Sequence, residues 1–219
     1  MPRSARLIVP GYPHHVTQRG CRRQRTFFDE SDYLDYLKLL TELRGPAGVD
    51  VWAYCLMPNH VHVIAVPRQK ESLAKLFGVA HHRYALRVNS DHGWRGHLWQ
   101  ERFHSCVMDD AHLLAAVRYV ELNPVCAGLC ARAEDWPWSS VHAHLRDRSD
   151  GLVTTAAMRE RIPDWPRFLL QDDAPKILNV LRESTNTGHP AGDSSFIDEL
   201  ERVTGRRLRR QKPGPKVKS

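Results

Sequence analysis

The sequence predicts an α+β fold of the ferredoxin-like, split β-α-β type, in which an antiparallel sheet carries helices on one face. Segments with alternating apolar residues and segments with helical periodicity follow one another in the order β-α-β-β-α-β, and a further helix comes next. The apolar fraction of 42% and the charged fraction of 26% are ordinary for a globular chain of 219 residues. A sheet of this kind leaves its other face available for a site.

The first half of this pattern is a strand followed by a helix. Residues 14–18 alternate and end at Arg19 and Gly20. Asp29 can cap a helix, and Gly45-Pro46 should end it. Three leucines are spaced to form the core-facing stripe of that helix: Leu34, Leu37 and Leu40.

The second half begins with a hairpin. Residues 49–56 are strand-like, and the turn at Met57-Pro58-Asn59 leads into a second strand that Pro67 closes. An amphipathic helix follows over residues 72–88, and a last strand is expected over residues 98–108. Asp109-Asp110 then caps a helix that ends at Pro124.

Three segments are expected along the chain. Residues 1–146 hold the sheet and its helices. Residues 147–205 form a helical extension, which begins with a linker-like stretch and ends with a helix from Ser194 to Gly205. Residues 206–219 form a basic tail.

The basic character of the chain is concentrated in that tail. The net charge is +7, and the tail holds seven Lys and Arg residues and no acid. Such an arm favours binding of nucleic acid phosphates, and a merely solvated terminus is the alternative. The residues expected to bind nucleic acid there are Arg206, Arg207, Arg209, Arg210 and Lys212.

A second group of arginines lies nearer the N-terminus. Arg19, Arg22 and Arg23 cluster around Gly20, a residue that would let the backbone approach DNA closely. Arg102 on the last strand is a further candidate for holding a phosphate, and an ordinary surface ion pair is its alternative.

The composition favours a cytoplasmic protein. No stretch reaches the roughly 18 apolar residues of a membrane span, and the N-terminus lacks the apolar core of a signal peptide. Five cysteines form neither an even framework nor a C-x-x-C pair, so reduced thiols are expected.

Two histidines carry the strongest chemical signal. His60 and His62 stand two apart in an apolar, β-branched run, so a strand points both side chains to one face. Imidazole is a common ligand of divalent metals, and this spacing predicts a metal site. The alternative is one histidine in the core and one at an edge.

The helix that ends at Pro124 adds a tyrosine and an amide. Tyr119 and Asn123 are four apart and share a helix face, away from the stripe of Leu113, Val117 and Val120. A phenol becomes a competent nucleophile when its electrophile is polarised and held in line. With a metal on His60 and His62, this set indicates transesterification of a nucleic acid phosphodiester, with Asn123 as third ligand.

Several longer motifs then resemble one family. They are residues 15–20 (HVTQRG), 54–62 (YCLMPNHVH), 98–105 (LWQERFHS), 118–125 (RYVELNPV) and 136–140 (WPWSS). The chain resembles the REP-associated tyrosine transposases, within the single-tyrosine HUH transposases of bacterial insertion sequences. The resemblance covers nearly all of residues 12–140 and continues more loosely into the basic tail.

The resemblance implies an activity and its parts. Tyr119 would be the nucleophile and His60 and His62 the ligands of Mg²⁺ or Mn²⁺; in related enzymes a glutamine stands at the place of Asn123. The implied substrate is single-stranded DNA beside hairpins of repetitive extragenic palindromes, in the bacterial cytoplasm at the nucleoid. A monomer is favoured and a dimer is the alternative. A non-catalytic hairpin binder and a metal-dependent phosphodiester hydrolase are the competing functions.

Overall fold

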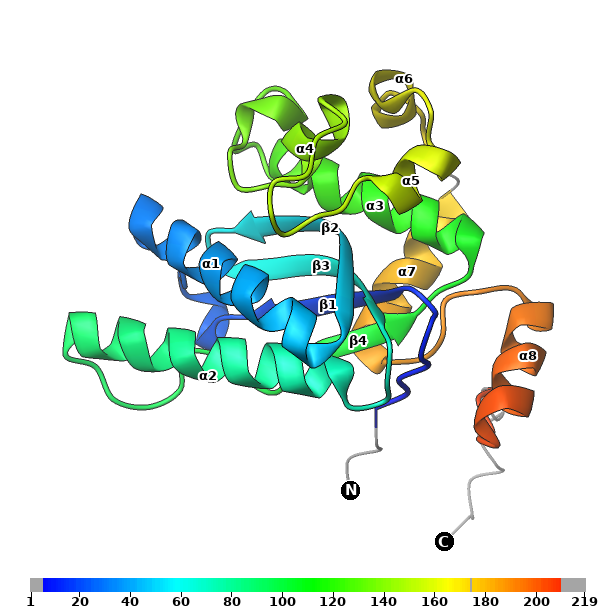
Figure 1. Ribbon diagram of the computed structural model, residues 1–219, viewed down its shortest axis with the longest axis horizontal. Coiled ribbons are helices and arrows are strands. Elements are labelled where there is room, and N and C mark those ends of the chain that lie inside the picture. The colour runs from blue at the N-terminus through cyan, green and yellow to red at the C-terminus, as the bar shows by residue number, and fades with distance from the viewer. Residues whose placement is uncertain (1–5, 174, 210–219) are drawn as a thin grey trace, which may run out of the picture.

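The computed structural model describes residues 6–173 and 175–209 and contains a four-stranded antiparallel sheet (Figure 1). Its strands are β1 (His14–Arg19), β2 (Val49–Met57), β3 (His60–Pro67) and β4 (His104–Val107). They lie in the order β2-β3-β1-β4. The helices α1 (Glu30–Ala47) and α2 (Ser72–His92) make the two crossovers. This is the split β-α-β arrangement, so the predicted fold class is confirmed.

The remaining helices follow β4. They are α3 (Asp110–Cys126), α4 (Val141–Leu145), α5 (Ala156–Arg161), α6 (Trp165–Leu169), α7 (Pro175–Thr187) and α8 (Ser194–Thr204). Two short 3-10 turns, η1 (Cys21–Arg23) and η2 (Ala133–Asp135), complete the described elements.

Helices cover both faces of the sheet, and this corrects the expectation that they lie on one face (Figure 1). The helices α1 and α2 pack on the face that carries Val16, Val61 and Val63. The helices α3 and α7 pack on the other face, which carries Ala53 and Ile64, and α5 and α6 add apolar side chains to the same cluster. The reason is that the strands alternate apolar residues to both faces, and the chain after residue 146 supplies the apolar helices that cover the second.

The helix α1 differs from its prediction at both its end and its buried stripe. It continues through Gly45-Pro46 to Ala47 and is capped by Gly48, whose φ of 68° is left-handed. Pro46 lies in the last turn, so the backbone hydrogen bond that its missing N–H removes is one at the end of the helix. The core positions are Tyr33, Tyr36 and Leu40, whereas Leu34 is 58% exposed.

The elements around α3 also differ in length from the prediction. The strand β4 is much shorter than expected, and the preceding Leu98 and Trp99 are buried in a loop. The helix α3 runs past Pro124 to Cys126. Its predicted apolar stripe is confirmed, since all three side chains are fully buried: Leu113, Val117 and Val120.

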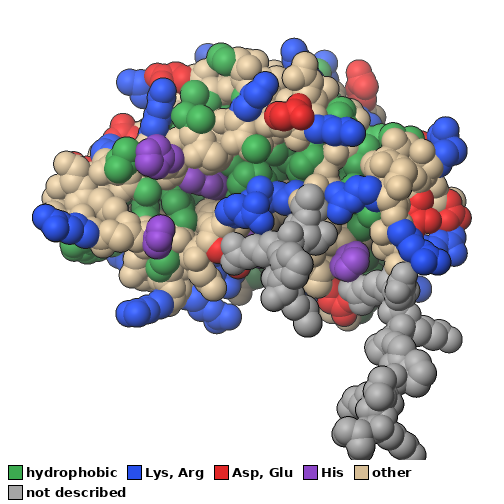
Figure 2. All heavy atoms as spheres, turned by 90° about the horizontal axis from the view of Figure 1, so that it is seen from below, with side chains coloured by type: hydrophobic (Ala, Val, Ile, Leu, Met, Phe, Trp, Pro, Cys, Tyr) green, Lys and Arg blue, Asp and Glu red, His purple; other side chains and the backbone are tan. Residues whose placement is uncertain are grey.

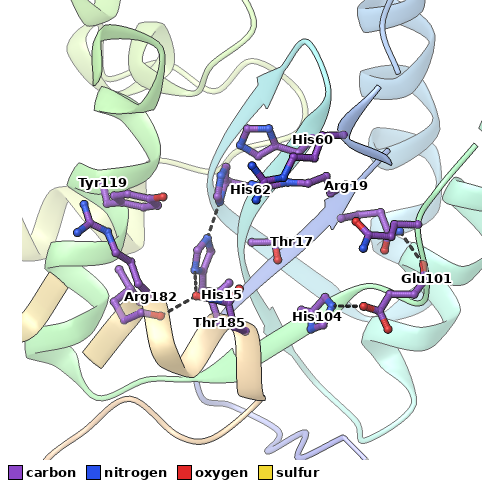
Figure 3. Close-up of a pocket in the computed structure, with 15 residues that line it drawn as sticks. His15, Thr17, Arg19, His60, His62, Glu101, His104, Tyr119, Arg182 and Thr185 are labelled. Atoms are coloured by element: carbon purple, nitrogen blue, oxygen red, sulfur yellow. Dashed lines mark hydrogen bonds and ion pairs between the residues drawn. The ribbon is translucent and has the colours of Figure 1, made fainter. Parts of the chain in front are cut away.

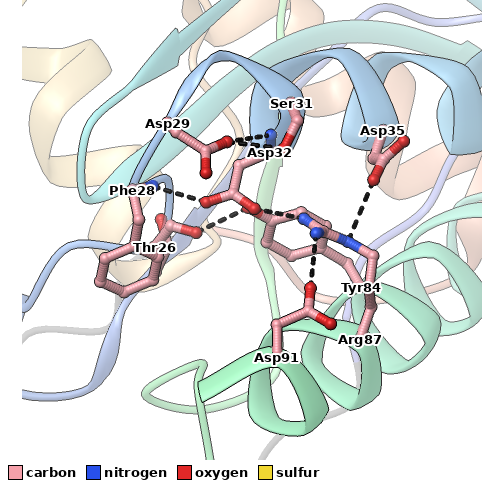
Figure 4. A network of polar contacts seen from close by, with 9 residues as sticks. All are labelled: Thr26, Phe28, Asp29, Ser31, Asp32, Asp35, Tyr84, Arg87 and Asp91. Atoms are coloured by element: carbon pink, nitrogen blue, oxygen red, sulfur yellow. Dashed lines mark hydrogen bonds and ion pairs between the residues drawn. The ribbon is translucent and has the colours of Figure 1, made fainter.

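A polar network joins α1 and α2 to the loop that follows η1 (Figure 4). Asp32 accepts a hydrogen bond from the backbone N–H of Phe28 at 2.6 Å and pairs with Arg87 of α2. Tyr84 donates its hydroxyl to the carbonyl of Thr26 at 2.6 Å. Arg87 also contacts Asp35 and Asp91, whose carboxylates are more exposed than that of Asp32. These contacts hold the loop directly behind the arginine-bearing turn η1.

The cysteines and the helices bear on two expectations from the sequence, reduced thiols and the lack of a membrane span. All five cysteines are unpaired. Within residues 6–173 and 175–209, every helix is too short or too polar to span a bilayer.

Candidate active site

The sheet face next to α3 and α7 contains a cavity of about 570 Å³ (Figure 3). Alternation along β1 and β3 brings five polar side chains into its lining: His15, Thr17, Arg19, His60 and His62. Strand pairing sets their neighbours, because Thr17 stands opposite His62 and Arg19 opposite His60. Residues from other elements complete the lining, among them Arg23, Glu101, His104, Tyr119, Arg182 and Thr185.

The two histidines predicted as metal ligands lie side by side in this cavity. Their ring centroids are 4.8 Å apart, with the planes at 77°. The ring of Tyr119 stands edge-on to His62, with 5.6 Å between centroids. The Nδ2 atom of Asn123 lies 3.3 Å from the Nε2 atom of His62. The structure therefore brings together His60, His62, Tyr119 and Asn123.

The hydrogen bonds of His60 leave one of its nitrogens free to bind a metal. The amide nitrogen of Asn59 donates to the carbonyl of Arg23 at 2.9 Å, so the amide oxygen Oδ1 faces the histidine. This oxygen lies 2.6 Å from Nδ1 of His60 and accepts its hydrogen. The neutral ring then carries its lone pair on Nε2.

The donor set fits a divalent ion. The Nε2 atoms of His60 and His62 supply two donors, and a half-turn of the Asn123 amide would present its oxygen as a third. No three His, Cys, Asp or Glu side chains converge to hold an ion in the part of the chain that the structure describes. Two imidazoles with an amide oxygen favour Mn²⁺ or a later divalent metal over Mg²⁺, which prefers an all-oxygen shell.

Burial favours the neutral form of the three imidazoles on β1 and β3, those of His15, His60 and His62. It lowers the pKa of His60 to about 4, with the charge of Arg19 adding to the effect. Burial also lowers the pKa of His15 to about 3 and that of His62 well below its ordinary value. Since a histidine binds a metal through a neutral ring, these shifts suit ligand formation at neutral pH.

The arginines near the N-terminus divide into two groups. Arg19 and Arg23 line the cavity, whereas Arg22 is exposed and lies outside the lining. Gly20 serves the turn itself, because a Cβ there would lie 2.4 Å from the carbonyl oxygen of Gln24. The close approach of DNA to this glycine stays a prediction.

A second cavity, of about 400 Å³, adjoins the first. The two share Glu101, His104 and Asn186 in their linings. Four arginines line the second cavity: Arg6, Arg102, Arg206 and Arg207. Burial, and then the charge of Arg102, lowers the pKa of Arg6.

The tail contributes to the second cavity only in part. Arg206 donates Nη1 to the carbonyl of Arg6 at 3.1 Å. Arg209 instead pairs with Asp198 of α8. Arg210 and Lys212 lie outside the described residues. Figure 2 shows Lys and Arg side chains from the middle of the lower face toward the end that carries α8.

Several lining residues were given no role by the sequence analysis, among them His15, Arg182 and Thr185. His15 lies within the motif at residues 15–20, and its alternation with Thr17 and Arg19 was a usable signal. Arg182 and Thr185 come from α7, in the expected extension. Nothing in the sequence placed this helix beside β1 and β4, so no local pattern could have found them.

Comparison with known proteins gives matches in sequence and structure. Residues 9–123, just over half of the chain, match the family described as IS200-like transposases. A curated protein of Haemophilus influenzae, provisionally described as a REP-associated tyrosine transposase, is 25% identical over 105 residues. That match covers 43% of this chain and 60% of the length of the curated protein.

A solved structure, described as the REP-associated tyrosine transposase bound to a REP hairpin, has the same fold. Its TM-score is 0.54 at 20% identity, over 69% of this chain and 88% of that one. The residues that match the family model include His60, His62, Tyr119 and Asn123. The resemblance drawn from the motifs is thus confirmed, and the chain belongs to the IS200-like transposase family.

Proposed function

We propose that this protein is a metal-dependent transesterase of single-stranded DNA that binds hairpin-forming repeats and cleaves and rejoins the strand through Tyr119. The main support is the placement of Tyr119, whose ring stands 5.6 Å from that of His62 in an arginine-lined cavity. A phenol, two neutral imidazoles and cationic side chains in one hollow match the needs of phosphoryl transfer.

The residues of the cavity have three different roles in this reaction. Arg19, Arg23 and Arg182 provide positive charge for the phosphate oxygens, and their planar guanidinium groups suit two-point contacts. His60, His62 and Asn123 would hold Mg²⁺ or Mn²⁺, which would neutralise and orient the scissile phosphate. Tyr119 on the rigid helix α3 presents its hydroxyl to that phosphate.

The reaction balances without a nucleotide cofactor. The Tyr119 oxygen forms a bond to phosphorus as the bond from phosphorus to the 3′-oxygen breaks. The phenol loses its proton and the leaving 3′-oxygen takes one up, so the products are a 5′-phosphotyrosine and a free 3′-hydroxyl. The number of phosphoester bonds is unchanged, and attack by a 3′-hydroxyl on the phosphotyrosine rejoins the strand.

The substrate and the oligomeric state are part of the proposal. A structural relative is described as bound to a REP hairpin, which supports hairpin-forming repeats as the DNA partner. One chain supplies Tyr119 and both histidines to a single cavity, which supports action as a monomer, with a dimer as the alternative. Acting on chromosomal repeats, the protein would work at the nucleoid in the cytoplasm.

The test uses a labelled single-stranded oligonucleotide that contains a hairpin. With Mn²⁺ the wild-type protein should form an adduct that survives denaturing electrophoresis, and a chelator should abolish it. Tyr119→Phe should lose the adduct completely and bind the oligonucleotide within about twofold of wild type, because only the nucleophilic oxygen is removed. Tyr12→Phe, which removes a hydroxyl bonded to Glu199 outside the cavity, is the matched control.

Two outcomes would contradict the proposal. Cleavage that persists in Tyr119→Phe would identify a phosphodiester hydrolase in which water attacks. Tight binding by the wild-type protein without any cleavage in Mn²⁺ or Mg²⁺ would identify a non-catalytic hairpin binder.

A further inference from the structure

A chain of hydrogen bonds leads from helix α7 to the candidate metal ligand His62 (Figure 3). Thr185 Oγ1 lies 2.8 Å from the carbonyl oxygen of Leu181, one turn back in α7. Nδ1 of His15 lies 3.0 Å from the same Oγ1. Nε2 of His15 in turn lies 2.9 Å from Nδ1 of His62. The rings of His15 and His62 are close to parallel, at 14°.

The direction of each hydrogen bond follows from the carbonyl end. A carbonyl oxygen only accepts, so the single hydroxyl hydrogen of Thr185 goes to Leu181. The Thr185 oxygen must then accept a hydrogen from Nδ1 of His15. A neutral His15 has no second ring hydrogen, so its Nε2 accepts from Nδ1 of His62.

Both rings are neutral on geometric grounds. The exposed fraction is 1% for His15 and 5% for His62, and a buried cation without a compensating charge is costly. Two protonated rings in direct contact would also repel each other. A neutral His62 with its hydrogen on Nδ1 carries its lone pair on Nε2, the atom that faces Asn123.

His60 reaches the same tautomer by a local route. Its Nδ1 hydrogen goes to the neighbouring Asn59, whose amide is oriented by a carbonyl of the η1 turn. His62 has a longer route that begins outside the sheet. One ligand is therefore oriented by its sequence neighbour, and the other by a helix more than a hundred residues further along the chain.

We propose that His15 is a positioning residue that holds His62 in its metal-binding tautomer, and that Thr185 of α7 sets the orientation of His15. The inference rests on the proposed metal-dependent function and deepens it. Groups that accept a hydrogen bond from the far ring nitrogen of a metal-bound histidine fix its tautomer and orientation, and losing them typically weakens metal affinity by about 10- to 100-fold. The helical extension would thereby take part in assembling the candidate site.

Two variants of His15 separate positioning from packing. His15→Gln keeps an acceptor oxygen near the position of Nε2, whereas His15→Phe keeps a ring and removes the acceptor. Mn²⁺ affinity, measured on the DNA-free protein by electron paramagnetic resonance, should fall at least about tenfold in His15→Phe. It should stay within about threefold of wild type in His15→Gln.

A third variant tests the end of the hydrogen-bond chain that lies in α7, and it hardly changes the size of the side chain. Thr185→Val is nearly isosteric and leaves Nδ1 of His15 without its acceptor. His15 should then move its hydrogen to Nε2, donate to His62, and shift the hydrogen of His62 to Nε2. Long-range ¹⁵N–¹H spectra of histidine-labelled, metal-free protein report this tautomer directly. Thr187→Val is the matched control, because Thr187 makes the same bond to a preceding carbonyl and does not contact His15.

The outcomes separate this inference from the proposed function. Wild-type His62 with its hydrogen on Nε2, or His15→Phe and Thr185→Val with unchanged tautomer and Mn²⁺ affinity, would overturn the inference even if the DNA adduct forms. The expected tautomer and Mn²⁺ binding without any adduct would overturn the proposed function and support the inference.

Discussion

The two faces of the sheet use the same strands for opposite purposes. Toward α1 and α2, the strands present Val16, Val61 and Val63, each fully buried. Toward α3 and α7, the neighbouring positions of β1 and β3 are His15 and His62, which line a cavity together with Thr17, Arg19 and His60. A period of two lets one strand carry core and site at once. A shift of one residue in register would therefore exchange them.

The faces also differ in how their polar groups are satisfied. On the α1–α2 side, the carboxylate of Asp32 pairs with the guanidinium of Arg87 and accepts a hydrogen bond from the backbone N–H of Phe28. In the cavity, the hydrogen bonds that run from Thr185 through His15 end at His62, whose Nε2 atom faces the side-chain amide of Asn123. The carboxylate of Asp32 thus finds its partners within the protein, whereas the nitrogen lone pairs of the cavity are suited to a ligand. We infer that substitutions on the first face change stability and that those on the second change binding.

The largest effect on stability is expected from Asp32→Ala. The change leaves Arg87 partly buried without its closest partner and removes the acceptor of the Phe28 N–H. Breaking a buried charge pair in this way typically costs about 3 kcal/mol. Urea unfolding should show that loss, while the adduct formed per folded molecule stays at the wild-type level.

Asp91→Ala is the control for that experiment. It removes another partner of the same Arg87, but its side chain is 55% exposed, and such a pair contributes less than about 1 kcal/mol. Equal destabilisation by the two substitutions, or a loss of adduct in folded Asp32→Ala, would show that the faces are not separate in this sense.

A smaller effect, which depends on pH, is expected from His81 in the α1–α2 core. Burial, together with the charge of Arg6, lowers the pKa of His81 to about 3, and its ring lies 2.8 Å from the Tyr36 hydroxyl. The unfolded chain takes up a proton at this residue below about pH 6.5, and the folded chain does not. Stability from this source is thus complete above pH 6.5 and falls as the pH drops toward 3.

The measurement for His81 is the change in unfolding free energy between pH 7 and pH 5. His81→Gln should lose roughly 1 to 2 kcal/mol less over this interval than the wild-type protein. The difference between the two proteins removes the contribution of groups they share. An identical loss in both would mean that His81 titrates alike in the folded and unfolded states.

What the sequence could predict follows from the range of the interactions involved. The order of strands and helices, the stripe of α3 and the end of α8 at Gly205 depend on local periodicity and capping. The pairing of Tyr119 with Asn123 and of His60 with His62 is likewise local. The resemblance then indicated how these two pairs belong together.

The parts that the sequence did not predict depend on contacts between distant segments. The helix α7 packs against β4 and α3, and only this packing brings Thr185 to His15. Similarly, Leu34 occupies a helical position that suits a core, yet Tyr33 and Tyr36 fill the space beside Phe27. Periodicity gives the spacing of a stripe, and the shape of the opposing surface decides which residues enter it.

The smallest effect is expected from the arginines of the second cavity, and it would extend the comparison to DNA binding. The double variant Arg102→Ala with Arg207→Ala should weaken binding of the hairpin oligonucleotide by about tenfold at low salt. Since each contact to a single-stranded phosphate contributes about 0.7 to the salt slope, the slope should fall by about 1.4. The matched control removes two arginines that pair with acids elsewhere on the surface, Arg68 and Arg132. An equal change in slope for both double variants would show that only net charge matters; a change confined to the first would extend the DNA-binding surface from the cavity of Tyr119 to the start of the basic tail.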